Sequence, residues 1–547
     1  MGRGAGQPAN VIFWGAGATK ELGIRTTDEQ GQFIRRLTGA GAPSASLEDR
    51  VKDALADKDT GPWHSALVDL ISILGDGDDA YLSIHKIDKD QLAAMRRNWQ
   101  SHANEEEIRQ RIIDLRLTYD WPALKSAVGI CPGSTTAKFR LNDLFNLLDM
   151  HVPPGSGFRA PTRRGELQFL DGRRLIGAKN ALLMTLIASF YVDYQVCISS
   201  KRDVLQKYKD VAVLLGRRMQ RRGRDLARAG VPLDTPQFYQ GDVGFVSMNY
   251  DPILFWVQFI ANSELNHSAS VPHIGSPAVP LHVFNDFGHL IPSRRVAKGD
   301  AESPWYPMNE AVTQRLNEST TGANHRVRLT KVLFPHGCLC WRECPNCGKL
   351  SSYHADRWEL PASDLLPPPP LLAFDKSACP DRITGKERRA RAAGIIDARS
   401  CLHCGELTVT NHTQVVMQSS FKPRPPSFIE EIQRDLRAMA MQASHIILMG
   451  YSLPPDDVTY RAFFSARSQR EGAEPVRCTV VNKDDANPGW YGADELKTRA
   501  FAETSAVNAA REVFGENVRF YGGGIPQVFL DGGVATDAKL DRLLEWS

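Results

Sequence analysis

Six short segments of the chain are apolar almost throughout, and each ends abruptly in glycine or in polar residues. In chain order they read NVIFWGAG, GFVSMN, KVLFPHG, HIILMG, VRCTVVN and NVRFYGGG. Such segments are typical of strands that are buried on both faces, and helical patterns lie between most of them. This alternation predicts an α/β fold with a doubly wound, mainly parallel sheet that is covered by helices on both faces.

The ends of these strands indicate where a ligand is expected. In an open parallel sheet, ligands bind in the crevice outside the carboxyl ends of the strands. The unusual residues of this chain lie at those ends, namely Gly15, Asn249, His336, Gly450 and Asn482. We therefore expect the functional site at the carboxyl edge of the sheet.

The regions between the strands suggest five segments. Residues 1–47 are expected to begin a Rossmann-like domain that continues over 241–336 and is completed by 411–547. Residues 48–240 show charged faces against spaced apolar positions, which predicts a large, mainly helical insertion. Residues 337–410 hold most of the cysteines and predict a small metal-binding module with a long insertion.

The composition is that of an ordinary soluble protein. The chain has 547 residues, of which 42% are hydrophobic, so it can bury a large core in two or three domains. A net charge of +3 is close to neutral and favours neither nucleic acid nor an anionic membrane as a partner. No apolar run of signal-peptide length precedes the first strand, and Ala181–Val192 is too short to cross a bilayer. We expect a cytoplasmic protein in which Ala181–Val192 is a buried core helix.

The basic run Gly216–Arg228 allows two interpretations. It could contact nucleic acid, or it could be the solvated face of a helix. It lacks the interleaved aromatic residues on which the bases of a single strand stack. The solvated face is therefore favoured, and nucleic acid is not expected as a partner.

The first strand runs into the turn Gly15-Ala16-Gly17-Ala18-Thr19. Two glycines at a strand-to-helix turn let the backbone approach a pyrophosphate, while the helix N-terminus supplies N–H donors and a favourable dipole. The full dinucleotide fingerprint requires a third glycine at a fixed spacing, and Gly23 lies too far along the chain. A tight turn without a ligand is therefore the alternative.

Asn249, Asp251 and His336 follow the second and third strands. Asp251 precedes Pro252, as the N-cap of a following helix would. Asn249 has no such role and is expected to point into the ligand crevice. His336 is suited to proton transfer near neutral pH, although it could also be an ordinary buried residue or a metal ligand beside the nearby cysteines.

Seven of the ten cysteines fall between Cys338 and Cys404. In a chain without a secretion signal, such clustering favours a metal over disulfides. Four of these cysteines form two CxxC pairs, Cys344 with Cys347 and Cys401 with Cys404. Four thiolates suit a closed tetrahedral zinc site, which holds the fold and leaves no open position for chemistry. The loop between the pairs is longer than usual, and Cys379 within it could replace one ligand.

Taken in order, these features resemble the sirtuin (silent information regulator) family. The matching pieces are a glycine turn, strand ends with Asn-x-Asp and His-Gly, a CxxC…CxxC module, a Gly-x-Ser-Leu turn and a strand that ends in Asn. In this chain they are Gly15–Thr19, Asn249–Asp251, His336–Gly337, the four cysteines, Gly450–Leu453 and Asn482. They extend from about Asn10 to Gly524, although residues 48–240 and 350–400 have no counterpart.

The resemblance implies that NAD binds between the sheet domain and a small zinc domain. It places the glycine turn at the pyrophosphate, the Gly-x-Ser-Leu turn at the adenosine side and Asn482 at the adenine ribose. Asn249 would hold the nicotinamide ribose and position the nucleophile, and His336 would take a proton from a ribose hydroxyl. The residues assigned to NAD binding are Gly15, Ala16, Gly17, Thr19, Asp251, Gly450, Ser452 and Asn482.

The chain departs from deacylating sirtuins at two places. It reads GIRTTDE where they carry Gly-Ile-Pro-Asp-Phe-Arg, and Met-Asn-Tyr-Asp where they carry Gln-Asn-Ile-Asp. The Asn-Tyr-Asp form and the GYSLPPDD turn are more similar to the sirtuin-like NAD hydrolases of bacterial anti-phage defence. That branch implies that water cleaves the bond between nicotinamide and ribose, giving nicotinamide and ADP-ribose without a catalytic metal.

Two other functions are left open by the sequence. One is an NAD-dependent protein deacylase or ADP-ribosyltransferase, and the other is a non-catalytic sensor that binds NAD or ADP-ribose. A toxic NAD hydrolase needs an off state, so a homo-oligomer or a defence-system partner protein is expected, with the helical insertion as a candidate for such contacts. An enzyme should lose turnover without the His336 side chain and keep its thermal stabilisation by nucleotide, which separates it from a sensor.

Overall fold

The computed structural model describes most of the chain. The described residues are 7–42, 44–55, 61–77, 83–99, 105–151, 156–162, 165–289, 293–295, 310–318, 325–343, 347–354, 415–417, 419, 421, 425–455, 457–468, 475–499, 501 and 505–546.

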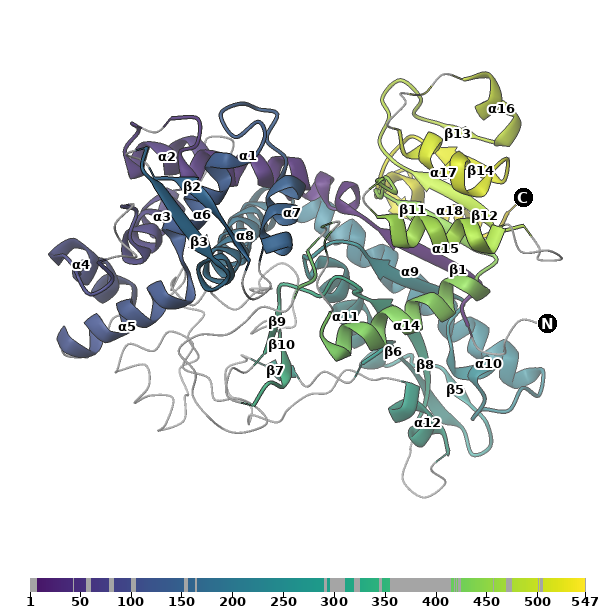
Figure 1. Ribbon diagram of the computed structural model, residues 1–547. Helices are drawn as coiled ribbons and strands as arrows, with labels where there is room; N and C mark the ends of the chain where they lie inside the picture. The colour runs from purple at the N-terminus through teal and green to yellow at the C-terminus, as the bar shows by residue number, and fades with distance from the viewer. Residues whose placement is uncertain are drawn as a thin grey trace.

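A mostly parallel sheet forms the centre of the fold (Figure 1). Among the described residues it has nine strands, in the order β13-β14-β12-β11-β1-β4-β8-β6-β5. The six strands expected from the sequence form its contiguous parallel block from β14 to β8, so the prediction of an α/β protein with a mainly parallel sheet is confirmed. Their bounds are β1 Asn10–Trp14, β4 Val243–Ser247, β8 Arg326–Leu333, β11 His445–Met449, β12 Arg477–Val481 and β14 Val518–Tyr521.

Further strands were not expected from the sequence. β6 (Val279–Asp286) pairs with β8 in parallel, while β5 (His273–Ile274) and β13 (Trp490–Tyr491) add antiparallel edges. β6 alternates between buried and half-buried residues over most of its length, so it lacks the continuous apolar run by which the other strands were recognised. The smaller sheets are formed by β2 (Gly157–Pro161) and β3 (Leu167–Asp171), by β7 (Ser293–Arg295), β9 (Trp341–Glu343) and β10 (Leu350–His354), and by β15 (Leu530–Asp531) and β16 (Val534–Ala535).

Helices lie on both faces of β1. Successive side chains of a strand point to opposite faces, and the last two residues of β1 show the two layers. Phe13 packs against Phe464 of α15 (Val458–Ser468), and Trp14 packs against Tyr208 of α9 (Arg202–Arg228). The other helices of the sheet domain are α10 (Pro236–Tyr239), α11 (Ile253–Asn266), α12 (Glu310–Glu318), α14 (Ser427–Gln442), α16 (Ala493–Thr498), α17 (Ala506–Phe514) and α18 (Asp537–Leu544).

A second body, made mainly of helices, lies beside the sheet domain (Figure 1). This body has its own hydrophobic core, and α8 contributes residues to it. The C-terminal half of α8 also contributes residues to the core of the sheet domain. Its helices are α1 (Thr27–Thr38), α2 (Leu47–Ala54), α3 (Gly61–Leu74), α4 (Lys89–Trp99), α5 (Glu105–Thr118), α6 (Trp121–Ile130), α7 (Leu141–His151) and α8 (Gly172–Ser200).

The hydrophobic cores do not divide the chain at the boundaries 48 and 240. α1 precedes residue 48, yet its residues Phe33, Ile34 and Leu37 belong to the helical core. α9 lies within 48–240, yet it belongs to the core of the sheet domain. The five-segment division therefore stays a prediction. By their core contacts, α1 belongs with the helical body and α9 with the sheet domain, which is the reverse of what the predicted boundaries give.

Helix α8 is long and apolar. Within the described part of the chain it is the one helix that could cross a membrane by length and composition, but 83% of its most apolar stretch is buried inside the protein. Ala181–Val192 is buried throughout, as expected for a core helix. The burial fits the core of a soluble protein.

The basic run lies on α9, and part of it contacts the C-terminal helix. Arg218 forms ion pairs with Asp541 and Glu545, and Arg221 forms one with Asp537 at 2.5 Å. Ion pairs at a partly exposed surface contribute about 0–1 kcal/mol each, so they orient α18 on α9 more than they stabilise the fold. These arginines contact protein carboxylates, in keeping with the interpretation that does not involve nucleic acid.

Candidate functional site

The carboxyl ends of β12, β11, β1, β4 and β8 lie side by side, because these strands are adjacent and parallel. We call this row of strand ends the carboxyl edge. β1 is at its centre, with β4 on one side and β11, which follows much later in the chain, on the other. The described residues that were predicted to bind NAD or to act in catalysis all belong to it: Gly15, Ala16, Gly17, Thr19, Asn249, Asp251, His336, Gly450, Ser452 and Asn482.

Two glycine turns touch at the centre of the carboxyl edge. The Gly15 N–H donates to the Met449 carbonyl at 3.0 Å, and the Gly17 N–H donates to the Gly450 carbonyl at 2.9 Å. A Cβ atom at Gly15 would lie 2.5 Å from the Gly450 oxygen, and one at Gly450 would lie 2.1 Å from the Ala18 nitrogen. We call this backbone contact the glycine contact. It requires glycine at these positions whether or not a ligand binds.

The expectation that a helix begins at the first glycine turn is wrong. Two short 3-10 turns follow β1, Ala16–Ala18 and Lys20–Leu22, and α1 begins only at Thr27. The N–H groups of Ala18 and Thr19 donate to carbonyls within the turn itself. No α-helical N-terminus therefore points its dipole at a pyrophosphate here.

The candidate NAD contacts of the two turns differ in exposure. Ala16 and Gly17 are half-buried, and Ser452 is exposed, so ligand atoms can reach them. Thr19 is only 1% exposed, and its hydroxyl donates to the Ala16 carbonyl at 3.3 Å. Asn482 is half-buried, and its backbone N–H donates to the Tyr521 carbonyl. Thr19 thus holds the shape of its turn, while the other four residues are at least partly accessible to a ligand.

Asp251 is a buried carboxyl group beside the start of α11. Its Oδ1 accepts the Ile253 N–H at 3.0 Å, so it caps the helix from the residue before Pro252, which occupies the N-cap position. Burial raises the pKa of Asp251 to about 6, and the Ile253 N–H and the nearby Asn249 amide oppose that rise. A carboxyl with this pKa can change its charge close to neutral pH.

Asn249 places a second polar group at the same strand end. The residue is 9% exposed, and its Nδ2 is buried without an acceptor at hydrogen-bond geometry among the described residues, although the Asp251 carboxyl is close. A buried donor without a partner costs about 1–3 kcal/mol of stability. The ligand-binding role expected for Asn249 stays a prediction.

His336 lies beneath the surface, between the ends of β8 and α15. It is 1% exposed, its Nδ1 donates to the Val416 carbonyl at 3.2 Å, and its Nε2 lies 3.4 Å from the hydroxyl of Tyr460. The ring of Tyr250 stands edge-on to it at 6.3 Å. The carbonyl requires a proton on Nδ1, so that in the neutral ring Nε2 is the acceptor nitrogen. Both nitrogens face protein groups, which argues against the alternative that His336 is a metal ligand.

Three residues near His336 were not expected from the sequence. Tyr460 of α15 contacts its Nε2, and the Tyr451 hydroxyl donates to Asp457 at 2.6 Å. Burial, and then the Asp457 charge, raise the pKa of Tyr460 above its ordinary value, so it stays a neutral donor. The sequence signal was the GYSLPPDD turn, which contains Tyr451 and leads into Asp457, but nothing in it shows that α15 reaches His336.

The zinc module falls mostly outside the described residues. Cys344, Cys401 and Cys404 lie outside them, and Cys347 is half-buried. Within the described ranges, no group of three or more His, Cys, Asp or Glu side chains is arranged to hold a metal ion. The zinc site therefore stays a prediction.

Cys338 and Cys340 are buried near the end of β4. Their sulfur atoms are 3.4 Å apart, and the Leu339 N–H between them donates to the Tyr250 carbonyl at 2.8 Å. Burial raises the pKa of the Cys338 thiol, which disfavours the reactive thiolate. The Leu339 hydrogen bond thus ties the segment after β8 to the segment after β4.

Arg25 explains part of the departure from the deacylase pattern. It is 8% exposed, and its guanidinium forms an ion pair with Asp193 of α8 and donates to Ser189 at 3.3 Å. Its backbone N–H also donates to Asp193, at 3.0 Å. Arg25 therefore attaches the glycine turn to the helical body and does not face a substrate at the carboxyl edge.

Comparisons with known proteins add no family to this description. No protein-family model matches the chain, and no curated protein matches its sequence. The proposal below rests on the residues and the geometry of the carboxyl edge.

The glycine contact can be tested by substituting Gly450 with alanine. Gly450 has a φ of 61°, and its Cβ would collide with the backbone of Ala18. Gly532 is the control, since its φ of 54° is also positive and a Cβ there would meet no atom within 4 Å. Both variants carry the left-handed penalty of about 1–2 kcal/mol, and Gly450→Ala should lose roughly 1–3 kcal/mol more in urea unfolding. Equal losses would show that the two turns do not touch.

The raised pKa of Asp251 predicts a pH dependence of stability. Its folded pKa of about 6 exceeds an unfolded value of about 3.9, so stability falls as pH rises between them. Asp251→Asn removes this effect and should gain about 3 kcal/mol relative to wild type between about pH 4 and pH 7, measured by urea unfolding. Asp485→Asn, at an exposed position, is the control and should follow wild type. A difference that does not change with pH would contradict the burial of the Asp251 charge.

Proposed function

We propose that this chain is a sirtuin-like NAD hydrolase that cleaves the bond between nicotinamide and ribose. The observation that carries the proposal is the placement of two polar groups at the end of β4, the unpaired Asn249 amide and the buried Asp251 carboxyl, next to the glycine contact and close to His336. These pieces come from strands that are distant in sequence. Their order along the edge agrees with the order that the resemblance to sirtuins implies.

NAD would lie across the carboxyl edge. Its pyrophosphate would sit at the half-buried backbone of Ala16 and Gly17, and its adenosine would extend toward Ser452 and Asn482. Because the turn after β1 lacks a helix dipole, the anion would depend on the backbone and on positive charge nearby. Lys20, three residues after Gly17, is exposed and is the nearest such charge in sequence.

The chemistry requires a held ribose and one oriented water. The nicotinamide bond breaks through an oxocarbenium-like state, which a buried carboxylate at Asp251 would stabilise electrostatically. Asn249 would orient the water, and the Nε2 of His336 would accept a proton from a hydroxyl group. In the structure, Nε2 faces the Tyr460 hydroxyl, so a substrate hydroxyl would take the place of that contact.

Hydrolysis is favoured over protein deacylation because the Asp-Phe-Arg element of deacylating sirtuins is missing from this chain. Arg25, which stands at the position of the preceding proline, is engaged by Asp193. A deacylase or ADP-ribosyltransferase is therefore the weaker alternative. The other alternative is a sensor that binds NAD or ADP-ribose without turnover. It is supported by the burial of His336, because a base that is 1% exposed must become accessible before it acts.

The cellular role rests on the resemblance alone. A regulated, NAD-depleting role in cytoplasmic anti-phage defence would require an off state, supplied by a homo-oligomer or by a partner protein. The helical body is the candidate surface for such contacts, and its link to the glycine turn through Arg25 and Asp193 offers a route for a signal. Zinc would be structural, bound by Cys344, Cys347, Cys401 and Cys404.

NAD turnover by purified variants tests the proposed function. His336→Asn keeps a donor for the Val416 carbonyl and removes the basic nitrogen, so turnover should fall about 10²–10⁴-fold while NAD still raises the melting temperature. Asn249→Ala should also lose turnover. His267→Asn, at an exposed histidine of the sheet domain, is the control and should match wild type. Products are resolved by chromatography as nicotinamide and ADP-ribose.

Two results would contradict the proposal. Undiminished turnover in His336→Asn would exclude the assigned base. NAD that neither reacts nor changes the melting temperature of wild type would exclude both the hydrolase and the sensor.

Metal analysis of the purified chain tests the zinc prediction. Four thiolates should retain about one zinc ion per chain, and Cys401→Ser should lose most of it. Cys379→Ser is the control for the cysteine within the long loop and should retain the metal. Zinc-free protein with all four thiols reduced, or retention of zinc in Cys401→Ser, would contradict the four-thiolate assignment.

A further inference from the structure

The hydroxyl group of Tyr460 occupies the nitrogen of His336 that the reaction needs. The hydroxyl lies 3.4 Å from Nε2, which is the acceptor nitrogen because Nδ1 donates to the Val416 carbonyl. Burial raises the pKa of Tyr460 above its ordinary value, so the phenol stays protonated and can donate. A neutral imidazole has one acceptor nitrogen, so a substrate hydroxyl and the Tyr460 hydroxyl cannot both bind there.

The protein covers His336 on its other side as well. His336 is 1% exposed and Tyr460 is 4% exposed. The Val416 N–H donates to the His336 carbonyl at 2.8 Å, and the Tyr250 hydroxyl donates to the Val416 carbonyl at 3.2 Å. A substrate therefore reaches Nε2 only after Tyr460 has moved away from it.

Tyr460 belongs to α15, and two hydrogen bonds join the start of α15 to the turn after β11. The Tyr451 hydroxyl donates to Asp457, the residue before the helix, at 2.6 Å. The Arg461 guanidinium donates to the Leu453 carbonyl at 3.1 Å. The position of the Tyr460 hydroxyl thus depends on the conformation of this turn.

Leu453 holds the backbone of this turn in the left-handed region. Its φ is 51°, and it is the only residue other than glycine with a positive φ in the described part of the chain. A leucine is strained there, because its Cβ lies too close to the following carbonyl oxygen. Strain of this kind is found at ligand clamps and switch regions. The turn after β11 is therefore the candidate hinge for a movement of α15.

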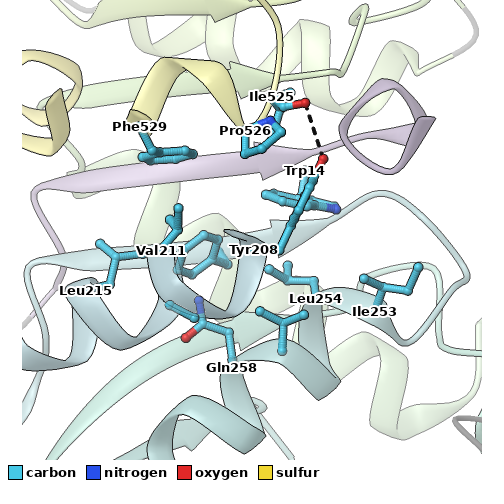
Figure 2. Close-up of a pocket in the computed structure, with 13 residues that line it drawn as sticks. Trp14, Tyr208, Val211, Leu215, Ile253, Leu254, Gln258, Ile525, Pro526 and Phe529 are labelled. Carbon is cyan, nitrogen blue, oxygen red and sulfur yellow. Dashed lines mark hydrogen bonds between the residues drawn. The ribbon is translucent and has the colours of Figure 1, made fainter. Parts of the chain in front are cut away.

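The glycine turn after β1 is held from its other side. The Tyr208 hydroxyl of α9 donates to the Ala18 carbonyl at 2.5 Å. It also lies 3.5 Å from the Ile525 carbonyl, and the ring of Trp14 stands edge-on beside it (Figure 2). The cavity between these side chains measures about 20 Å³, which is room for about one water molecule. A pivot at Leu453 would leave this packing and the glycine contact in place.

We propose that α15 is a gate over His336, that the gate is closed in this structure, and that the Tyr460 hydroxyl is its latch. In the open form the latch has left Nε2, and a ribose hydroxyl of NAD takes its place. The gate supplies an off state within a single chain. This inference rests on the proposed function, because it names the regulation of the same histidine.

Tyr460→Phe removes the latch and keeps the ring that packs edge-on to Phe13. Loss of one hydrogen bond shifts an equilibrium about 2–10-fold, so NAD turnover should rise by about that factor. Tyr491→Phe removes the same atom from the edge strand β13 and is the control, which should match wild type. When Tyr460→Phe is combined with His336→Asn, the gain should vanish, because the gate acts through His336.

Reaction of histidines with diethyl pyrocarbonate, mapped by mass spectrometry, tests the gate without NAD. The reagent modifies accessible neutral imidazole, so His336 of wild type should react far more slowly than the exposed His267. In Tyr460→Phe the rate at His336 should rise about 2–10-fold, and the rate at His267 should not change. His445, which is 3% exposed, reports global unfolding and should stay as slow as in wild type.

The outcomes separate the gate from the proposed function. A modification rate at His336 that does not change in Tyr460→Phe overturns the gate. A turnover that falls or stays equal, where wild-type turnover is measurable, overturns it as well. If His336 reacts faster in the variant while neither protein consumes NAD, the gate stands and the proposed function fails.

Discussion

The contact between the turn after β1 and the turn after β11 sets the geometry of the whole carboxyl edge. Here two backbones approach so closely that no side chain fits between them, and N–H groups of one turn donate to carbonyls at the end of the other strand and its turn. Because β1 is central in the sheet, this contact also fixes where the ends of β4 and β12 lie relative to it. A ligand site at the carboxyl edge depends on these relative positions of the strand ends.

Around the contact, the chain keeps polar groups where burial makes them costly. Asp251 is held in a surrounding that disfavours its charge, and the Asn249 amide lacks an acceptor at bonding geometry among the described residues. The stability lost there must be recovered in the two hydrophobic cores on either side. Such groups at a strand end are expected when they interact with a ligand and not with the protein. His336 differs, because protein groups lie within hydrogen-bond distance of both of its nitrogens.

The parallel sheet and the residues at its carboxyl edge could be predicted from the sequence. Buried parallel strands appear there as uninterrupted apolar runs, and their ends appear as glycine or polar residues. The missed strand β6 alternates between buried and half-buried residues over most of its length, so it carries no such run. The helix expected after Gly17 was wrong because the chain forms two 3-10 turns that end at Gly23 in a left-handed conformation. The contact of His336 with Tyr460 joins residues 124 positions apart, and the glycine contact joins still more distant ones. Local patterns hold no information on such contacts.

The central claim is that NAD binds across the carboxyl edge, and hydrogen exchange measured by mass spectrometry locates bound NAD most directly. The His336→Asn variant is suited to this, because slow turnover leaves the nucleotide intact. The account predicts that saturating NAD protects backbone amides in the peptides that contain residues 14–25, 247–253, 449–455 and 481–485. Protection confined to α9 and α11, or to the helical body, with these four peptides unchanged, would contradict it.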